Sequence, residues 1–414
     1  MKTTTSPAPF LGITLLAAAV LMVTMGARQT LGLFLSPINT TTGLGIVSIS
    51  LAMAVAQFVW GAVQPIAGAL ADRYGHMRVV MVGVFVAALG SALTPFMSST
   101  WGLIFAIGLL SAAGTGAASF SVLIGATAQR VAPEARGMSS GIINAGASFG
   151  QFVFAPLTQF LISGLGWMGA MWSLAVLTLG ALPIAARLRH HTGSTAIPAA
   201  TLAAPEAATP SPDGLRAAVR HAFADRSYLL LHAGFFTCGF HIAFLVTHLP
   251  GEVQLCGLPA QVASWALGII GLANIVGSLA AGWSLKFYRG KYVLFWMYGS
   301  RALLIVLYLL APKTALTFYL FAAGLGLTWL ATVPPTAGVV GKLFGMRYLA
   351  TLFGLTLLSH QIGAFFGAWL GGLAVTEFGD YKWMWYADIA LAATAAILNL
   401  PIREARIVPA LKPA

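Results

Sequence analysis

The chain has 414 residues, of which 58% are hydrophobic and only 8% are charged, and its mean hydropathy is +0.87. These values exclude a soluble globular protein, and a chain so poor in charge also lacks the composition of a disordered one. The net charge of +12 does not indicate nucleic-acid binding, because the basic residues stand singly between apolar segments. The two cysteines, Cys238 and Cys256, are too few for a disulfide or metal framework. The composition predicts an all-α membrane protein.

Twelve apolar stretches are each about 20 residues long, the length that crosses the hydrocarbon layer. Each must be helical, since lipid cannot satisfy backbone polar groups. In chain order the predicted helices are 10–35, 46–70, 79–97, 101–128, 137–163, 167–186, 228–249, 261–285, 292–311, 315–340, 348–375 and 383–401. The first is too long for a secretory signal and lacks a basic lead and a cleavage site, so we expect it to be helix 1.

The segment 187–227 separates the sixth and seventh predicted helices. It contains four prolines among Ala, Thr and Ser, and it ends in a basic stretch from Arg216 to Arg226. This composition predicts a flexible cytoplasmic linker that ends in a short amphipathic helix. It divides the chain into an N-terminal six-helix bundle, 1–186, and a C-terminal six-helix bundle, 228–414.

The distribution of Lys and Arg predicts the orientation. With the N-terminus inside, the cytoplasmic segments hold eighteen of these residues and the outer loops hold two, Lys313 and Lys382. Both termini are therefore expected in the cytoplasm. Arg28 and Arg301 remain, and both fall within predicted helices.

Helices 1 and 7 share a residue spacing. In each, a glycine and a proline stand eleven residues apart, and a basic residue comes two positions after the glycine. The residues are Gly26, Arg28 and Pro37 in the first half and Gly239, His241 and Pro250 in the second. Helices 5 and 11 each carry two glycines nine residues apart. Together these matches favour an internal duplication, which is common in transporters.

The segment from Gly68 to Arg78, with the sequence GALADRYGHMR, lies between helices 2 and 3. It resembles the signature loop of the major facilitator superfamily, and the resemblance extends over essentially the whole chain. Within the superfamily the chain looks most like the monocarboxylate porters, through Arg28 on helix 1 and the helix 5 segment from Gly146 to Pro156. Those porters carry an Asp and an Arg on helix 8, whereas residues 261–285 here have no charge. The resemblance implies two pseudo-symmetric bundles whose helices 1, 4, 7 and 10 line a cavity.

Asp72 and Arg73, with Arg78, are candidate gating residues at the cytoplasmic end of helix 2. A carboxylate there can accept hydrogen bonds from a neighbouring helix N-terminus, and an arginine can reach another carboxylate. Such contacts could form in one conformation and break in the other. The alternative is that these charges are solvated and only enforce the topology.

Arg28 is the first candidate for substrate binding. An arginine within a span costs at least about 2.5–3.5 kcal/mol unless it has a partner or a cavity, and the only acid in the predicted spans is Asp388. A cation without a protein counterion suits an anion, and the planar guanidinium matches a carboxylate. Arg301 is a second candidate, with a structural role, capping carbonyls or reaching Asp388, as the alternative.

Coupling to protons requires a titrating group. The candidates are His241, His248 and His360, with Asp388 as a further choice. The repeat favours His241, since it makes this residue the symmetry mate of Arg28, facing the same cavity. The alternative for each histidine is a packing role with a hydrogen bond to a neighbour.

Further polar or amphipathic side chains at mid-span depth are candidates for the cavity lining, although such residues also hold helices together. They are Gln29, Asn144, Gln151, Asn274, Thr328, Trp329 and Gln361. The pair Pro334-Pro335 is expected to interrupt helix 10 and to give it a bend.

The sequence thus predicts a transporter that moves a small organic anion by alternating access, most simply by electroneutral proton symport of a monocarboxylate such as lactate or pyruvate. Exchange of dicarboxylates, with Arg301 as a second clamp, and export of amphiphilic drug-like solutes are the alternatives. No nucleophile motif, metal-ligand spacing or phosphate loop indicates an enzyme or a cofactor. We expect a monomer in the bilayer of a bacterial inner (plasma) membrane.

Overall fold

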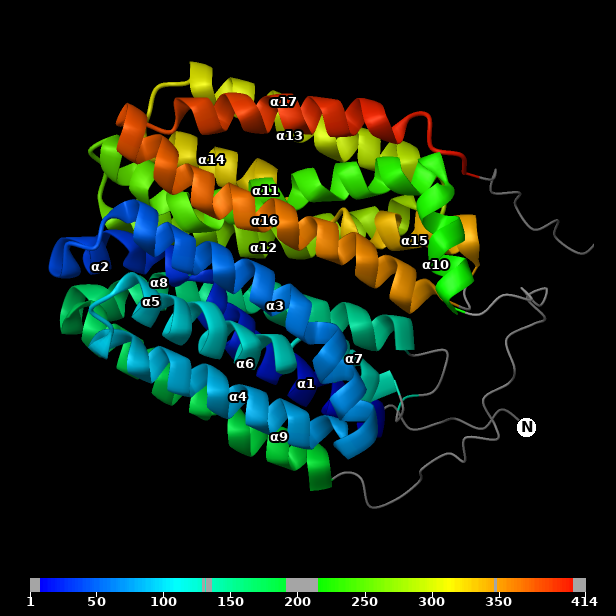
Figure 1. Ribbon diagram of the computed structural model, residues 1–414, viewed down its shortest axis with the longest axis horizontal. Coiled ribbons are helices and arrows are strands. Elements are labelled where there is room, and N and C mark those ends of the chain that lie inside the picture. The colour runs from blue at the N-terminus through cyan, green and yellow to red at the C-terminus, as the bar shows by residue number, and fades with distance from the viewer. Residues whose placement is uncertain (1–7, 129–130, 132–135, 191–214, 346–347, 405–414) are drawn as a thin grey trace, which may run out of the picture.

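The computed structural model describes residues 8–128, 131, 136–190, 215–345 and 348–404 (Figure 1). All regular structure within these ranges is helical, which confirms the predicted all-α class. The N-terminal half contains α1 (Ala8–Gln29), η1 (Leu31–Phe34), α2 (Leu35–Thr42), α3 (Ile46–Tyr74), α4 (His76–Leu93), η2 (Thr94–Phe96), α5 (Thr100–Leu103), η3 (Ile104–Ser111), α6 (Ala112–Ala117), α7 (Phe120–Ala128), α8 (Arg136–Leu179) and α9 (Ala181–His190).

The C-terminal half follows residues 191–214, which lie outside the described part of the chain. It contains α10 (Leu215–Ala224), α11 (Arg226–Leu255), α12 (Ala260–Ser284), α13 (Gly290–Leu310), α14 (Ala315–Gly326), α15 (Val333–Phe344), α16 (Leu349–Phe378) and α17 (Lys382–Asn399). The short helix expected at the end of the linker is present as α10.

The described residues form twelve membrane crossings, the number that the sequence predicts. Nine helical stretches are by themselves long and apolar enough to span a bilayer. One of these, Met138–Leu188, contains two crossings, because Gly166 (φ 70°) breaks the helix in its middle. The broken pair α14 and α15 forms another crossing, and α17 forms the last. The apolar residues of the first six crossings, from Ile13 to Leu188, form a core of their own.

Helix 10 is interrupted, as expected, although the interruption precedes the prolines. α14 ends at Gly326, residues 327–332 form turns, and α15 starts at Val333 with Pro334 and Pro335 in its first turn. A proline is tolerated in the first turn of a helix because its missing N–H would be unpaired there anyway. The two prolines therefore start the second half of helix 10 rather than bend a continuous helix.

The two bundles touch along α3 and α16, but only over part of their length. A β-carbon at Gly372 of α16 would meet Ser50, and one at Gly61 of α3 would meet Gln361. Gly68 lies seven residues after Gly61, on the same face of α3, yet nothing lies within 4 Å of the position its β-carbon would take. The bundles are thus closed near Gly372 and separated near Gly68.

The separated end is the one at which α1 begins and α17 ends (Figure 1). The first residues of α16 and the last residues of α3 belong to this end, since the crossings alternate in direction. At the opposite end, η1 of the first bundle lies against α11 of the second, where Gly32 faces the backbone of Val246 and Thr247. A central site would therefore be reached from the end of the molecule at which α1 begins and α17 ends.

Candidate functional site

Arg28 lies one residue before the end of α1, where the chain changes into the short helix η1. Its Nη2 donates a hydrogen bond to Oε1 of Gln57, and its guanidinium lies 4.2 Å from the ring centroid of Trp60. Both partners are on α3 and neither is charged. Within the described ranges no carboxylate forms an ion pair with Arg28. The guanidinium thus contacts a neutral amide and an aromatic ring, and its positive charge is available to an anionic ligand.

A cavity lies beside Arg28, between the two bundles. Its volume is about 20 Å³, which is room for about one water molecule. The lining residues are Arg28, Leu31, Gly32, Met53, Ala56, Gln57, Ile107, Ser111, Ala112, Thr115, Val246 and Thr247. Most are apolar, and the polar groups come from helices 1, 2, 4 and 7. The space is too small for an organic acid, so a substrate could enter only after the bundles move.

The other candidates for the cavity lining lie elsewhere. The residues Gln29, Asn144, Gln151, Asn274, Thr328, Trp329 and Gln361 are all absent from this cavity. Gln29 and Gln151 are buried and Asn144 is half-buried. Gln361 is buried at the contact between the bundles, against Gly61 and beside His360. Their role in substrate binding stays a prediction.

Asn274 of α12 instead holds the interruption of helix 10. Its Oδ1 accepts a hydrogen bond of 2.9 Å from the backbone N–H of Leu330, and its Nδ2 donates to the Ser148 hydroxyl at 2.7 Å. Ser148 belongs to α8 of the other bundle. Both the oxygen and the nitrogen of this amide are therefore engaged in structural contacts.

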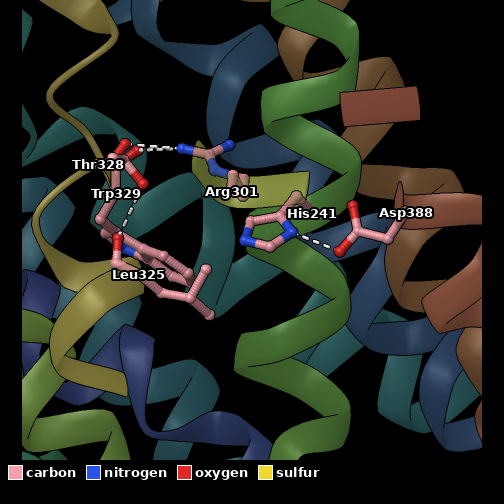
Figure 2. Close-up of polar contacts among 6 residues, drawn as sticks. All are labelled: His241, Arg301, Leu325, Thr328, Trp329 and Asp388. Atoms are coloured by element: carbon pink, nitrogen blue, oxygen red, sulfur yellow. Dashed lines mark hydrogen bonds and ion pairs between the residues drawn. The ribbon is translucent and has the colours of Figure 1, made fainter. Parts of the chain in front are cut away.

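Arg301 of α13 also lies away from the cavity and is 0% exposed. Figure 2 shows its guanidinium directed at the interruption of helix 10, where Nη2 donates to the carbonyls of Thr328 (2.6 Å) and Trp329 (3.4 Å). A cation is stabilised beside the free carbonyls that follow a helix C-terminus. In this conformation the arginine caps the backbone of the other two, as the structural alternative for it predicts. Contact of Arg301, Thr328 and Trp329 with the substrate stays a prediction.

His241 of α11 forms a pair with Asp388 of α17, through its Nδ1 and the carboxylate Oδ2 (Figure 2). Both side chains are 0% exposed. The ring of Trp329 lies on the other side of His241, with 6.1 Å between the ring centroids. His241 does not line the cavity of Arg28, so the expectation that the two residues share one cavity is wrong. Val246 and Thr247, further along α11, face Arg28 instead.

The other two histidines have packing contacts. His248 Nε2 donates to the Ala368 carbonyl at 2.7 Å, and its Nδ1 can accept from the Tyr381 hydroxyl at 3.4 Å. His360 is 8% exposed and lies beside Gln361, with its Nδ1 3.3 Å from the amide. With both nitrogens engaged, His248 has the contacts of the packing alternative rather than those of a proton carrier.

Three groups of the described structure were not among the candidates. Gln57 and Trp60 hold Arg28, and Glu252 is a buried acid, 9% exposed, that accepts a hydrogen bond of 2.7 Å from Tyr308. Glu252 was missed because helix 7 was expected to end at residue 249, whereas α11 continues through Pro250 to Leu255. Its spacing from His248, four residues, would have placed both on one helical face.

The comparisons with known proteins decide the family. The model of the Major Facilitator Superfamily matches residues 17–367. The chain belongs to this superfamily. It is thus a membrane transporter and not an enzyme.

Among curated members of the superfamily, the chain is similar to proteins named monocarboxylate transporters. It is 28% identical to monocarboxylate transporter 13 of Rattus norvegicus over 85% of this chain and 78% of the relative. It is 28% identical to monocarboxylate transporter 11 of Mus musculus, with 88% and 81% covered. It is 24% identical to an oxalate:formate antiporter of Oxalobacter formigenes, with 88% and 85% covered.

Solved structures of superfamily transporters share the fold. A D-xylose-proton symporter superposes with a TM-score of 0.75 at 12% identity, over 95% of this chain and 97% of the other. A bacterial homologue of the human lysosomal transporter Spinster, in an inward-facing and unoccupied conformation, gives a TM-score of 0.71 at 15% identity, over 96% and 95%. These likenesses show the fold alone.

The superfamily's signature loop joins α3 to α4 through Gly75, whose φ of 95° suits only glycine well. Arg73 and Arg78 are exposed at this turn, and the Arg73 guanidinium lies 5.3 Å from the ring centroid of Tyr74. The side chain of Asp72 lies outside the described part of the structure. The gating role of these residues therefore stays a prediction.

Proposed function

We propose that this transporter moves a small organic anion, and that its cargo is a monocarboxylate such as lactate or pyruvate, taken up together with a proton. Alternating access by the two bundles carries the cargo across the membrane. The observation that carries the proposal is Arg28, a cation between the bundles whose described partners, Gln57 and Trp60, are both neutral.

The placement of Arg28 favours a carboxylate over a neutral solute. The guanidinium lies beside the cavity at the level where η1 meets α11, so a ligand bound to it would touch both bundles. A planar guanidinium binds a carboxylate through two parallel hydrogen bonds, and such pairs are strong in a site shielded from water. The names of the similar monocarboxylate transporters agree with this choice.

A monocarboxylate bound to Arg28 cancels one positive charge, and a proton taken up with it makes the transported pair neutral. His241 and Asp388 are the strongest candidates for the proton site, since they form a buried pair of titratable groups away from the cavity. The proton site would then lie within the C-terminal bundle and the anion site between the two bundles. Both ligands could be carried in a single conformational change.

Exchange of one anion for another is the second candidate, because an oxalate:formate antiporter is among the similar proteins. Exchange needs no titrating residue. Arg301, the expected second ligand of a dicarboxylate, lies away from the cavity and donates to backbone carbonyls. This placement disfavours a dicarboxylate bound between two arginines. Export of amphiphilic solutes would leave the lone cation of the cavity unexplained.

We also propose that both termini lie in the cytoplasm of a bacterial cell, with the chain in the inner membrane as a monomer. The excess of Lys and Arg on the side of the termini supports this orientation. The conformation described above, with the bundles separated at the end where α1 begins and α17 ends, is then open toward the cytoplasm.

Uptake into proteoliposomes tests the proposal. Purified protein is reconstituted, and radiolabelled lactate or pyruvate is added with and without an inward proton gradient, and with unlabelled oxalate or lactate inside the vesicles. Uptake that the gradient accelerates severalfold, and that a protonophore abolishes, supports symport. Uptake that needs an internal anion and ignores the gradient indicates exchange. If no carboxylate enters in any arm, the anion proposal is wrong.

A further inference from the structure

A buried polar cluster surrounds the interruption of helix 10, and its hydrogen-bonding groups are only partly used. Arg301 binds the carbonyls of Thr328 and Trp329 through Nη2, while its Nε and Nη1 are buried without a hydrogen-bond partner. In the neighbouring pair, Nε2 of His241 and Oδ1 of Asp388 are buried and unpartnered as well. A buried polar group without a hydrogen-bond partner is costly and calls for an explanation, such as a partner that it gains in another conformation of the protein.

The unpartnered atoms are chemically complementary. When His241 carries its only ring proton on Nδ1, toward Asp388, its Nε2 has a free lone pair and can accept a hydrogen bond from Arg301. When Nε2 is protonated as well, it becomes a donor and the ring becomes a cation, which repels the guanidinium. Arg301 is an electrostatic neighbour of His241, and Figure 2 shows the two side chains next to each other.

We propose that Arg301 is a positioning residue that links the protonation of His241 to the shape of helix 10. A proton on Nε2 keeps the guanidinium on the carbonyls of Thr328 and Trp329, as the structure has it. When that proton leaves to water, Arg301 turns to Nε2 and releases the two carbonyls, so that α15 can move relative to α14. This inference rests on the proposed proton coupling and names the residue that transmits it.

The charges of the cluster agree with such a switch. Without the second ring proton, the pair of His241 and Asp388 has a net charge of −1, which offsets the charge of Arg301. With it, the pair is neutral, and the guanidinium is then best stabilised by the carbonyls beyond the C-terminus of α14. The other titratable groups that face this cluster are Cys238, Tyr298 and His360, from α11, α13 and α16.

The direct test compares the pH dependence of uptake in wild-type protein, R301M and R301K. Removing the cation beside His241 favours the protonated ring, so the pH of half-maximal uptake rises in R301M by roughly one unit. R301K keeps a cation with hydrogen-bond donors and should stay within about half a unit of wild type. A residue with a purely structural role would lower the rate of R301M and leave the midpoint unchanged, which would overturn the inference.

A second readout needs no substrate, and so separates this inference from the proposed function. A cysteine placed at Gly338 of α15, where a β-carbon meets nothing within 4 Å, is labelled with a membrane-impermeant maleimide at pH 5.5 and pH 8. We expect the labelling rate to change severalfold with pH in the wild-type background and to become constant in H241Q and R301M. If the pH effect persists in both variants, Arg301 and His241 do not control helix 10, even where uptake proves to be proton-driven. Uptake without proton coupling would reject the proposed symport whatever the labelling shows.

Discussion

Gly32 of η1 lies directly against the carbonyl oxygen of Val246 on α11, with no space for a β-carbon. The contact joins the two bundles at the end opposite the start of α1, beside the cavity of Arg28. It can form only when the bundles close at that end, and it must open for the opposite conformation. The two bundles can therefore close at this end only because residue 32 has no side chain.

The variant Gly32→Leu tests this closure. The added side chain would overlap the α11 backbone, which cannot yield as a flexible side chain does, so the bundles should no longer close at this end. We expect uptake to fall at least tenfold while the protein still inserts and purifies as a folded monomer. Gly338→Ala is the matched control, since its β-carbon meets nothing within 4 Å and uptake should stay near wild type. Normal uptake by Gly32→Leu would show that this contact is not needed.

Arg28 is expected to carry the affinity for the anion. Truncating one partner of a shielded charge pair costs about 3 kcal/mol, so Arg28→Ala should lower kcat/KM for lactate or pyruvate roughly a hundredfold. Arg28→Lys keeps the charge but loses the bidentate geometry, so its kcat/KM should lie between the values of wild type and Arg28→Ala. Concentration-dependent initial rates in proteoliposomes measure both. Equal rates for wild type and Arg28→Ala would remove this residue from the site.

Gln57 and Trp60 should affect the position of Arg28 rather than the charge of the site. Gln57→Ala removes the hydrogen bond to the guanidinium, so we expect KM to rise severalfold, less than in Arg28→Ala. Trp60→Phe keeps an aromatic face and should change KM little, whereas Trp60→Ala removes the cation–π contact, which contributes about 0.5–2 kcal/mol. Initial rates at a series of substrate concentrations give the KM of each variant and so test this order of effects. A larger loss in Gln57→Ala than in Arg28→Ala would make the amide, not the cation, the main ligand.

The sequence predicted the twelve crossings, because the length of an apolar stretch is a local property and the thickness of the bilayer sets the length that is needed. It also singled out Arg28, since a charge inside an apolar stretch is visible without knowing its neighbours. The pairing of His241 with Asp388 could not be foreseen. It depends on which faces of α11 and α17 meet, across 147 positions of the chain, and no local pattern contains that information.

The sequence left the roles of Arg301 and Asn274 open between substrate binding and structure for the same reason. Both residues bind backbone groups of the interruption in helix 10, and that interruption starts seven residues before the prolines that signal it. Polar side chains at mid-span depth look alike in sequence, whether they face a cavity or satisfy free carbonyls and amides. Only the position of the unpaired backbone groups separates these two cases.

Asn274 should therefore matter for stability more than for substrate affinity. Asn274→Ala leaves the buried N–H of Leu330 without an acceptor and the Ser148 hydroxyl without its donor, which costs about 1–3 kcal/mol. We expect a lower unfolding temperature in detergent and a KM within about twofold of wild type. Asn274→Asp retains the acceptor for Leu330 and separates this bond from the bond to Ser148. A large rise in KM with unchanged stability would return Asn274 to the substrate site.

His241 and His248 of α11 should respond differently to substitution, since only His241 is paired with a carboxylate. His248 has its nitrogens engaged by the Ala368 carbonyl and the Tyr381 hydroxyl, so His248→Gln should lower thermal stability while the pH profile of uptake keeps its shape. His241→Gln removes the proton-binding ring beside Asp388 and should flatten the profile between pH 5.5 and 8, leaving any uptake insensitive to a proton gradient. Uptake measured across this pH range, alongside melting curves of both variants, gives the comparison. A flattened profile in His248→Gln with an intact one in His241→Gln would move the proton site toward the C-terminal end of α11, where Glu252 would be the next residue to test.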